Sequence, residues 1–278
     1  MKKAIVHFFA LFVSGASLFA QEPLSIINQM FETTKAAKTV KYSFDSKERV
    51  GGKVIHEVSD FKINTQPFKV YMKQKSPKEG LEVLYISGQG KAKVNPNAFP
   101  WVSLNLDPEG SLMLDKHHHS LLDAGFNYTI SLIEFLINKY KADAPKIIKD
   151  NGLVKVQNVN CYYYTLSNPN YKLISYTTGD NETVLTIAKK LKLNYFMILE
   201  NNPHIKGLGV IKKGTVLSVP NDYASKMEMY IHKDKLYPVY LKIYDHKGLY
   251  EEYTFTNVDL NAPLKDIDFS AENPNYDF

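Results

Sequence analysis

The chain of 278 residues is long enough for one large domain or two modest ones. With 44% hydrophobic and 23% charged residues, its composition is globular, which excludes disorder for most of its length. Of the 34 basic residues only Arg49 is an arginine, and this disfavours nucleic-acid recognition, which relies on bidentate guanidinium groups. The single cysteine, Cys161, excludes a disulfide framework and a metal site built from several thiolates.

Residues 1–20 are predicted to be a secretory signal peptide. Lys2 and Lys3 precede an apolar run from Ala4 to Phe12, and Ala20 offers a cleavage point. The run is too short to span a membrane, and no later stretch reaches about twenty apolar residues. A retained membrane anchor is the alternative. We therefore expect a protein that is secreted across the inner membrane to the periplasm, does not span a membrane, and loses two lysines on cleavage, from a charge of +5 to +3.

The mature chain is expected to begin with a helix and continue with strands. Apolar residues recur at helical spacing over residues 24–38. From Val40 they alternate, and Gly51-Gly52 suits the positive φ angles of a tight hairpin turn. Further alternating stretches run to residue 72, followed by a more buried strand over 81–86 and another strand from Ala92 that Pro96 ends.

Helical spacing returns over residues 127–141, before more strands. Gly152 is expected to open one of these strands, and Cys161 lies in the next. A period of two resumes after about residue 226. These patterns predict the α+β fold class, with one large antiparallel sheet that buries one face under the helices at 24–38 and 127–141.

Residues 172–221 interrupt this pattern and resemble a LysM module. The matching pieces are Tyr176-Thr177, the stretch 183–188, Ile198-Leu199 ahead of Asn202-Pro203, and Ile211 to Gly214 leading into Leu217 to Pro220. The resemblance implies a βααβ insert whose first and last strands pair. The family usually has Gly-Asp-Thr where this chain has Asn181-Glu182-Thr183, so we expect Asn181 or Asp180 to cap the first helix.

The same resemblance implies binding of N-acetylglucosamine chains, here peptidoglycan glycan strands. The groove would lie between residues 180–184 and 201–205. Its residues would be Asp180, Asn181, Glu182, Thr183, Val184, Asn201, Asn202, Pro203 and His204. The alternative is a LysM fold kept as a structural or protein-contact insert.

The remainder, residues 21–171 plus 222–278, resembles the LolA-type periplasmic lipoprotein carriers. The resemblance is carried by Ser59 to Ile63, Gln66 to Val70, Met229 to Ile231, Leu236 to Val239, and Tyr253 to Val258. It implies a strongly curved antiparallel sheet, an incomplete β-barrel, that wraps helices around an apolar cavity for acyl chains or lipoproteins. The cavity residues would be Phe61, Ile63, Phe68, Val70, Met72, Ile133 and Leu136. A dry, filled core made of the same side chains is the alternative.

The chain shows no recognisable catalytic, metal or cofactor site. Cys161 lies in an alternating strand and is expected to be a buried structural thiol. The run His117 to His119 is expected to be a solvated loop, and Glu251 and Glu252 should point to opposite faces of a strand. We therefore predict a non-enzymatic, secreted cell-envelope binding protein. The rivals are a structural or protein-interaction role with a filled core, and an enzyme with an unrecognised site.

Overall fold

The computed structural model describes residues 22–278, so the predicted signal peptide lies outside the described residues. Eleven of its strands form one sheet. They are β1 (Thr39–Val50), β2 (Lys53–Thr65), β3 (Phe68–Ser76), β4 (Glu82–Ile86), β5 (Ala92–Asn95), β6 (Leu104–Leu106), β7 (Ile148–Val156), β8 (Val159–Ser167), β11 (Lys226–His232), β12 (Pro238–Asp245) and β13 (Gly248–Leu260).

The sheet is antiparallel throughout and does not close. Its strand order is β6-β5-β4-β3-β2-β1-β13-β12-β11-β8-β7, which leaves β6 and β7 as the two edges. Alternation sets which side chains face inward: in β11, Met227, Met229 and Ile231 are buried, whereas the residues between them are partly exposed. The predicted α+β class with a curved, incomplete barrel is confirmed.

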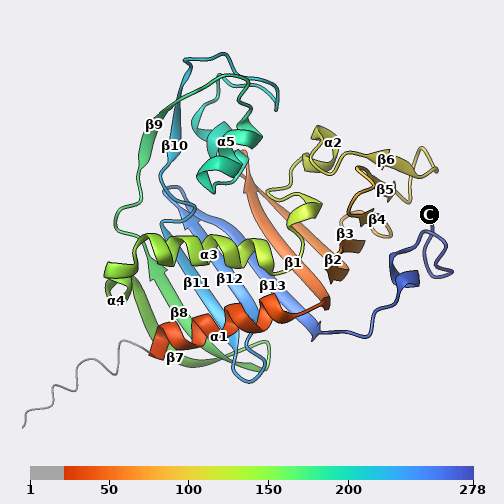
Figure 1. Cartoon of the computed structure of the whole chain (residues 1–278), viewed down its shortest axis with the longest axis horizontal. Helices are drawn as coiled ribbons and strands as arrows, with labels where there is room; N and C mark the ends of the chain where they lie inside the picture. Colours follow the sequence, from red (N-terminus) through yellow and green to blue (C-terminus); the bar gives the residue numbers. More distant parts are fainter. Residues whose placement is uncertain (1–21) are drawn as a thin grey trace, which may run out of the picture.

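Two helices cover one half of the sheet. Figure 1 shows α1 (Glu22–Ala36) and α3 (Asn127–Lys139) lying across β7, β8, β11, β12 and β13, with the short α4 (Ala144–Ile147) at one end. Ile27 of α1 and Ile133 and Leu136 of α3 are at most 3% exposed. The prediction of two covering helices is confirmed.

The other half of the sheet, β1 to β6, is covered by an irregular segment, residues 107–126, which we call the cover segment. It holds only the one-turn helix α2 (Ser111–Leu114) and the 3₁₀ turn η1 (Leu121–Asp123). Residues 262–278 lie on the opposite face of β3 and β4, where Tyr276 stacks on Tyr71 with ring centroids 3.7 Å apart. The sequence did not predict either covering.

The insert folds as β9 (Leu173–Thr177), α5 (Val184–Leu191), α6 (Tyr195–Asn201) and β10 (Val216–Pro220). The two strands pair antiparallel, with Tyr176 opposite Leu217, as predicted. The prediction of the helix cap was wrong. Thr183 caps α5, because its Oγ1 accepts a hydrogen bond from Thr186 N at 3.1 Å, while Asn181 takes a left-handed turn conformation with φ 55°.

The predicted start of the strand at Gly152 was also wrong. β7 begins at Ile148, and Gly152 lies within it at an irregularity of its pairing with β8, with φ 80°. A glycine with positive φ inside a strand marks such an irregularity as readily as it marks a strand's beginning.

Candidate functional site

A cleft of about 370 Å³ lies between the concave face of β1 to β6 and the cover segment. Its floor is a row of apolar side chains, each directly opposite the next on the neighbouring strand. The row consists of Tyr42, Phe61, Met72, Val83, Val94 and Leu104, one from each of the six strands. Because neighbouring strands lie about 4.8 Å apart, the row spans roughly 24 Å.

The cover segment supplies the other wall of this cleft. Leu112, Met113 and Leu121 line it from that side. Leu112 is 76% exposed although it lines the cleft, so apolar surface continues out to solvent there. The arrangement is a long apolar slot with an accessible side.

The cleft becomes polar along the direction of the strands. One step beyond the apolar row, Ser59 of β2 lies opposite both Phe44 of β1 and Gln74 of β3. One step further, Ser46 lies opposite Glu57. All five side chains line the cleft, which is therefore amphiphilic: apolar on one side and polar on the other.

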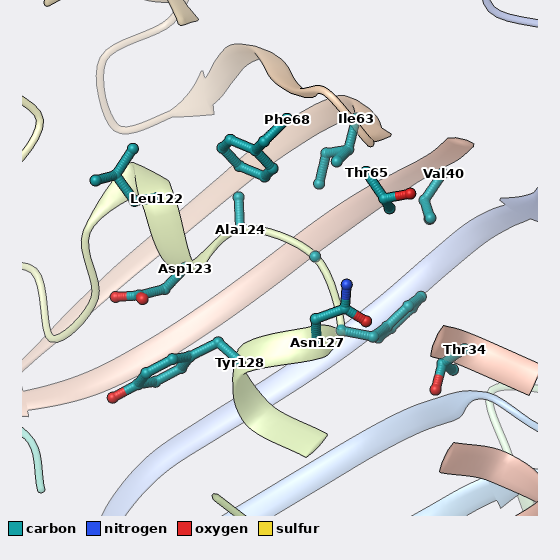
Figure 2. A pocket seen from close by; sticks show the side chains of 12 residues that line it. Thr34, Val40, Ile63, Thr65, Phe68, Leu122, Asp123, Ala124, Asn127 and Tyr128 are labelled. Atoms are coloured by element: carbon teal, nitrogen blue, oxygen red, sulfur yellow. The ribbon is translucent and has the colours of Figure 1, made fainter. Parts of the chain in front are cut away.

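A smaller cavity of about 220 Å³ lies on the far side of the turn from η1 into α3. Figure 2 shows Leu122, Asp123 and Ala124 on the ribbon that passes over the strands carrying Ile63 and Phe68. Asp123, Ala124, Gly125 and Tyr128 line both cavities, so this turn is the partition between them.

Behind the polar end of the cleft lies a buried cluster of His118, His119, Glu251 and Tyr223, which we call the His–Glu cluster. Glu251 Oε1 lies 2.8 Å from His118 Nδ1 and 3.2 Å from His119 Nε2, and accepts a hydrogen bond from the Tyr223 hydroxyl at 2.7 Å. The His118 and Glu251 side chains are fully buried. The prediction of a solvated histidine loop was therefore wrong for His118 and His119. His117 alone is substantially exposed, where it pairs with Glu57.

The electrostatics of the His–Glu cluster favour charged imidazoles. Burial opposes protonation, but the Glu251 carboxylate outweighs burial and raises the pKa of His119 to about 9. The pKa of His118 is also raised, against burial, by Glu48 and Glu251. Burial opposes the charge of Glu251 as well, yet the two imidazoles hold its pKa well below the usual range. Its second oxygen, Oε2, is buried without a hydrogen-bond partner in the described part of the chain.

The His–Glu cluster ties the cover segment to the sheet. His118 Nε2 lies 2.9 Å from the Arg49 carbonyl oxygen, and the backbone N–H of His118 donates to Glu48 at 2.7 Å. Tyr253 of β13 donates its hydroxyl proton to the same carboxylate at 2.8 Å. The sheet thereby holds the cover segment from two strands.

The insert holds the cover segment from the other side. The Asn194 side-chain amide donates to the His118 carbonyl, and the Tyr195 hydroxyl lies 2.6 Å from the Leu114 carbonyl oxygen and 2.7 Å from that of His117. The cover segment is thus held between α6 of the insert and the host sheet.

The predicted cavity residues divide among three places. Phe61 and Met72 line the main cleft, whereas Ile63 and Phe68 line the smaller cavity. The other three, Val70, Ile133 and Leu136, are buried in the core and line neither. Sequence reasoning missed the apolar row beyond β3, together with the whole cover segment.

The predicted sugar-binding residues also differ in their surroundings. Two of them are buried, Val184 and Asn202, and the Asn202 side chain bridges the backbones of Ile198 and Ser218. Glu182 accepts from the Tyr176 hydroxyl at 2.6 Å and from Gly179 N, which lowers the pKa of this carboxyl group to about 2.

The remaining members of that set are more accessible. The Asn201 side chain donates to the Met197 carbonyl, and Thr183 forms a backbone bridge with Val210. The exposed members are Asp180, Asn181, Pro203 and His204.

Three other residues behave as the sequence indicates. Cys161 is buried, and burial raises the pKa of its thiol to about 11. Glu251 points inward, while Glu252 points to the other face and pairs with Lys47 at 2.8 Å. Among residues 22–278, no three His, Cys, Asp or Glu side chains are grouped so that they could hold a metal ion.

The open curved sheet and its amphiphilic cleft define a half-barrel fold with an internal cleft. The chain belongs to the family described as "Protein of unknown function (DUF1571)", whose model matches residues 38–182 and 208–278. The unmatched residues between these two ranges contain α5 and α6 of the insert. No curated protein matches the chain.

Several solved structures are similar to this chain at low identity. They include the lipoprotein LppX of Mycobacterium tuberculosis, with 12% identity, 88% of this chain and 98% of that chain covered, and a TM-score of 0.42. A DUF1329 family protein from Desulfovibrio piger has 12% identity, 91% and 97% coverage, and a TM-score of 0.36. A Vibrio parahaemolyticus domain described as outer membrane lipoprotein-sorting has 10% identity, 90% and 97% coverage, and a TM-score of 0.35.

Within residues 22–278, no helix has both the length and the apolar character needed to cross a membrane.

Proposed function

We propose that this protein binds the acyl chain of a lipid or lipoprotein in the main cleft, as a non-enzymatic carrier or binding protein of the cell envelope. The observation that carries the proposal is the continuous apolar row across six strands, roofed by leucine and methionine side chains. The volume of the cleft, about 370 Å³, lies within the range of ligand pockets, about 300–1,000 Å³. A long, narrow apolar slot suits a linear chain better than a compact ligand.

Binding is tested by mass spectrometry of lipids that co-purify with the secreted protein in the absence of detergent. The delipidated protein is then melted with and without methyl palmitate. A ligand that binds only the folded state at a hundredfold excess over its Kd stabilises that state by about 2.7 kcal/mol, so the melting temperature rises.

Two matched variants locate the binding. Val94→Phe fills the apolar row at β5, between Val83 and Leu104, and should abolish both the co-purified lipid and the rise in melting temperature. Val54→Phe makes the same change at a side chain that is 66% exposed and should leave both intact. If methyl palmitate does not change the melting temperature and no lipid co-purifies, the carrier proposal is wrong and the structural role with a filled core takes its place.

A second function, peptidoglycan binding, is proposed for the insert. What supports it is that the βααβ order and strand pairing implied by the LysM resemblance are present, with Asp180, Asn181, Pro203 and His204 exposed on its loops. The protein should then sediment with purified peptidoglycan.

The test of this second function avoids residues that hold the insert together. The double variant Asp180→Ala/His204→Ala should weaken sedimentation, whereas Lys172→Ala, an exposed residue at the edge of the insert, should not. If the double variant sediments as the wild type does, and raised salt abolishes this sedimentation, the contact belongs to surface lysines. Salt has this effect because it screens exposed charges beyond about 8–10 Å.

A further inference from the structure

The polar side of the main cleft contains three polar side chains that have no hydrogen-bond partner in the described part of the protein. Their polar atoms are accessible from the cleft, since none of them is a fully buried atom without a partner. Gln74 is 4% exposed, Ser59 6% and Ser46 8%, and all three line the cleft from adjacent strands. The backbone of Gln74 is fixed, because its N–H donates to the Leu81 carbonyl and its own carbonyl accepts from Gly80 N. Its side-chain amide, in contrast, has no hydrogen bond to any residue in the described range, and the same holds for the two serine hydroxyls.

Such groups are costly in a core and useful in a binding site. These polar groups are accessible from the cleft, so a ligand bound there can form hydrogen bonds with them directly. Ser59 and Gln74 are cross-strand neighbours, and both adjoin the apolar row through Phe61 and Met72 on their own strands. A molecule whose chain occupies the apolar row therefore has its polar end beside these three side chains.

The charges around these three polar side chains favour an uncharged head group. Three carboxylates, Glu48, Glu57 and Asp123, line the cleft. Against them stand the ammonium group of Lys78 at its exposed rim and the imidazole of His117, whose Nδ1 lies 3.3 Å from Glu57. The imidazole of His119 also lines the cleft, but its Nε2 is turned to Glu251 and Tyr223. An anionic head would face the carboxylates, and a cationic head would leave the amide and hydroxyl donors unpaired.

We propose that Ser46, Ser59 and Gln74 form a head-group subsite for an uncharged, hydroxyl- and ester-bearing amphiphile of the acylglycerol class. This inference rests on the proposed acyl-chain binding and adds the chemistry of the head group. Amide and hydroxyl groups both donate and accept hydrogen bonds, so a head that does the same can satisfy all three side chains.

The test compares three ligands with the same acyl chain on the delipidated full-length mature protein. These are 1-monopalmitoylglycerol, methyl palmitate, which lacks the hydroxyls, and palmitate, which is anionic. Two added hydrogen bonds correspond to about tenfold in affinity, so monopalmitoylglycerol should bind about tenfold more tightly than methyl palmitate. Palmitate should bind more weakly than monopalmitoylglycerol.

The variants Gln74→Met and Ser59→Ala should remove this preference while methyl palmitate binding stays within about twofold. Gln74→Met nearly preserves side-chain volume and removes the unpartnered amide, so the unliganded variant should melt no lower than the wild type. Lys75→Met is the matched control, because Lys75 is the next residue of β3 and its side chain pairs with Asp60 instead of lining the cleft.

The outcomes separate this inference from the function on which it rests. If none of the three ligands binds, the acyl-chain function fails, and the subsite with it. If all bind with equal affinity, or if the preference survives in Gln74→Met and Ser59→Ala, the subsite is refuted while acyl-chain binding stands.

Discussion

A buried carboxylate between two imidazoles makes the stability of this protein depend on pH. The pKa of His119 is raised to about 9, so its stabilisation is complete below the unfolded value near 6.5 and is lost as the pH rises through 9. The pKa of Glu251 is lowered, so its contribution is complete above about 4.5 and is lost only in acid. The contribution of this cluster to stability is therefore largest between about pH 4.5 and 6.5.

The free energy of unfolding should fall by roughly 1–3 kcal/mol between pH 6.5 and 9. Urea denaturation at a series of pH values measures it. His119→Gln should flatten much of this fall, whereas His204→Gln, a change of an exposed histidine on the insert, should leave it unchanged. A profile equally steep in His119→Gln would mean that another group is responsible.

At the residue scale, the sequence led to the expectation of a solvated histidine loop and did not reveal this buried cluster. Three adjacent histidines look the same whether they are solvated or buried, and the partner Glu251 is 133 residues away from His118 in the sequence. Only the strand pairing of β13 with β1 brings Glu251 opposite Glu48 and creates the site for the imidazole. The N-cap was mistaken for a related reason: Asn181 is a good cap by residue type, but its left-handed turn leaves that role to Thr183.

At the element scale, periodic segments were predictable and the cover segment was not. The strands and the two long helices follow periods of two and 3.6, which a sequence displays directly. Residues 107–126 contain no long periodic run. The positions of their apolar side chains are set by contacts with the sheet and the cleft, which the local sequence does not display. Of the predicted cavity residues, Phe61 and Met72 lie on the floor of the cleft, whereas Ile133 and Leu136 belong to α3, which packs tightly over the other half of the sheet.

The contact of α6 with the cover segment should determine how readily the cleft opens. Tyr195→Phe keeps the aromatic ring and removes the one hydroxyl proton that the carbonyls of Leu114 and His117 share. The Leu114 carbonyl still accepts from His117 N, so the cost is about 1 kcal/mol. Amide hydrogen exchange should then accelerate over residues 111–120. Tyr162→Phe, a change on β8 away from the cover segment, should not accelerate exchange there. Unchanged exchange in Tyr195→Phe would show that the sheet alone holds the cover segment.

At the scale of the whole molecule, the insert combines features of a separate unit with contacts that support the rest of the chain. Its ends lie together, because Lys172 and Asn221 exchange hydrogen bonds at 2.9 and 3.0 Å. All eleven strands of the large sheet lie outside it. Its buried side chains nevertheless belong to the same apolar cluster as those of the host. Close ends favour independent folding, while the shared core and the contacts of α6 oppose it.

Excision of residues 172–221, with a short Gly-Ser bridge in their place, tests which effect dominates. Because the host keeps every sheet pairing and both covering helices, we expect a cooperative thermal transition at a lower temperature than in the full chain. The loss of Asn194 and Tyr195 should also free the cover segment, so the excised protein should bind methyl palmitate more weakly than the full chain. Circular dichroism melting and ligand titration measure both. If the excised protein shows no cooperative transition, the insert is part of the host core and the boundary at 172–221 does not separate two domains.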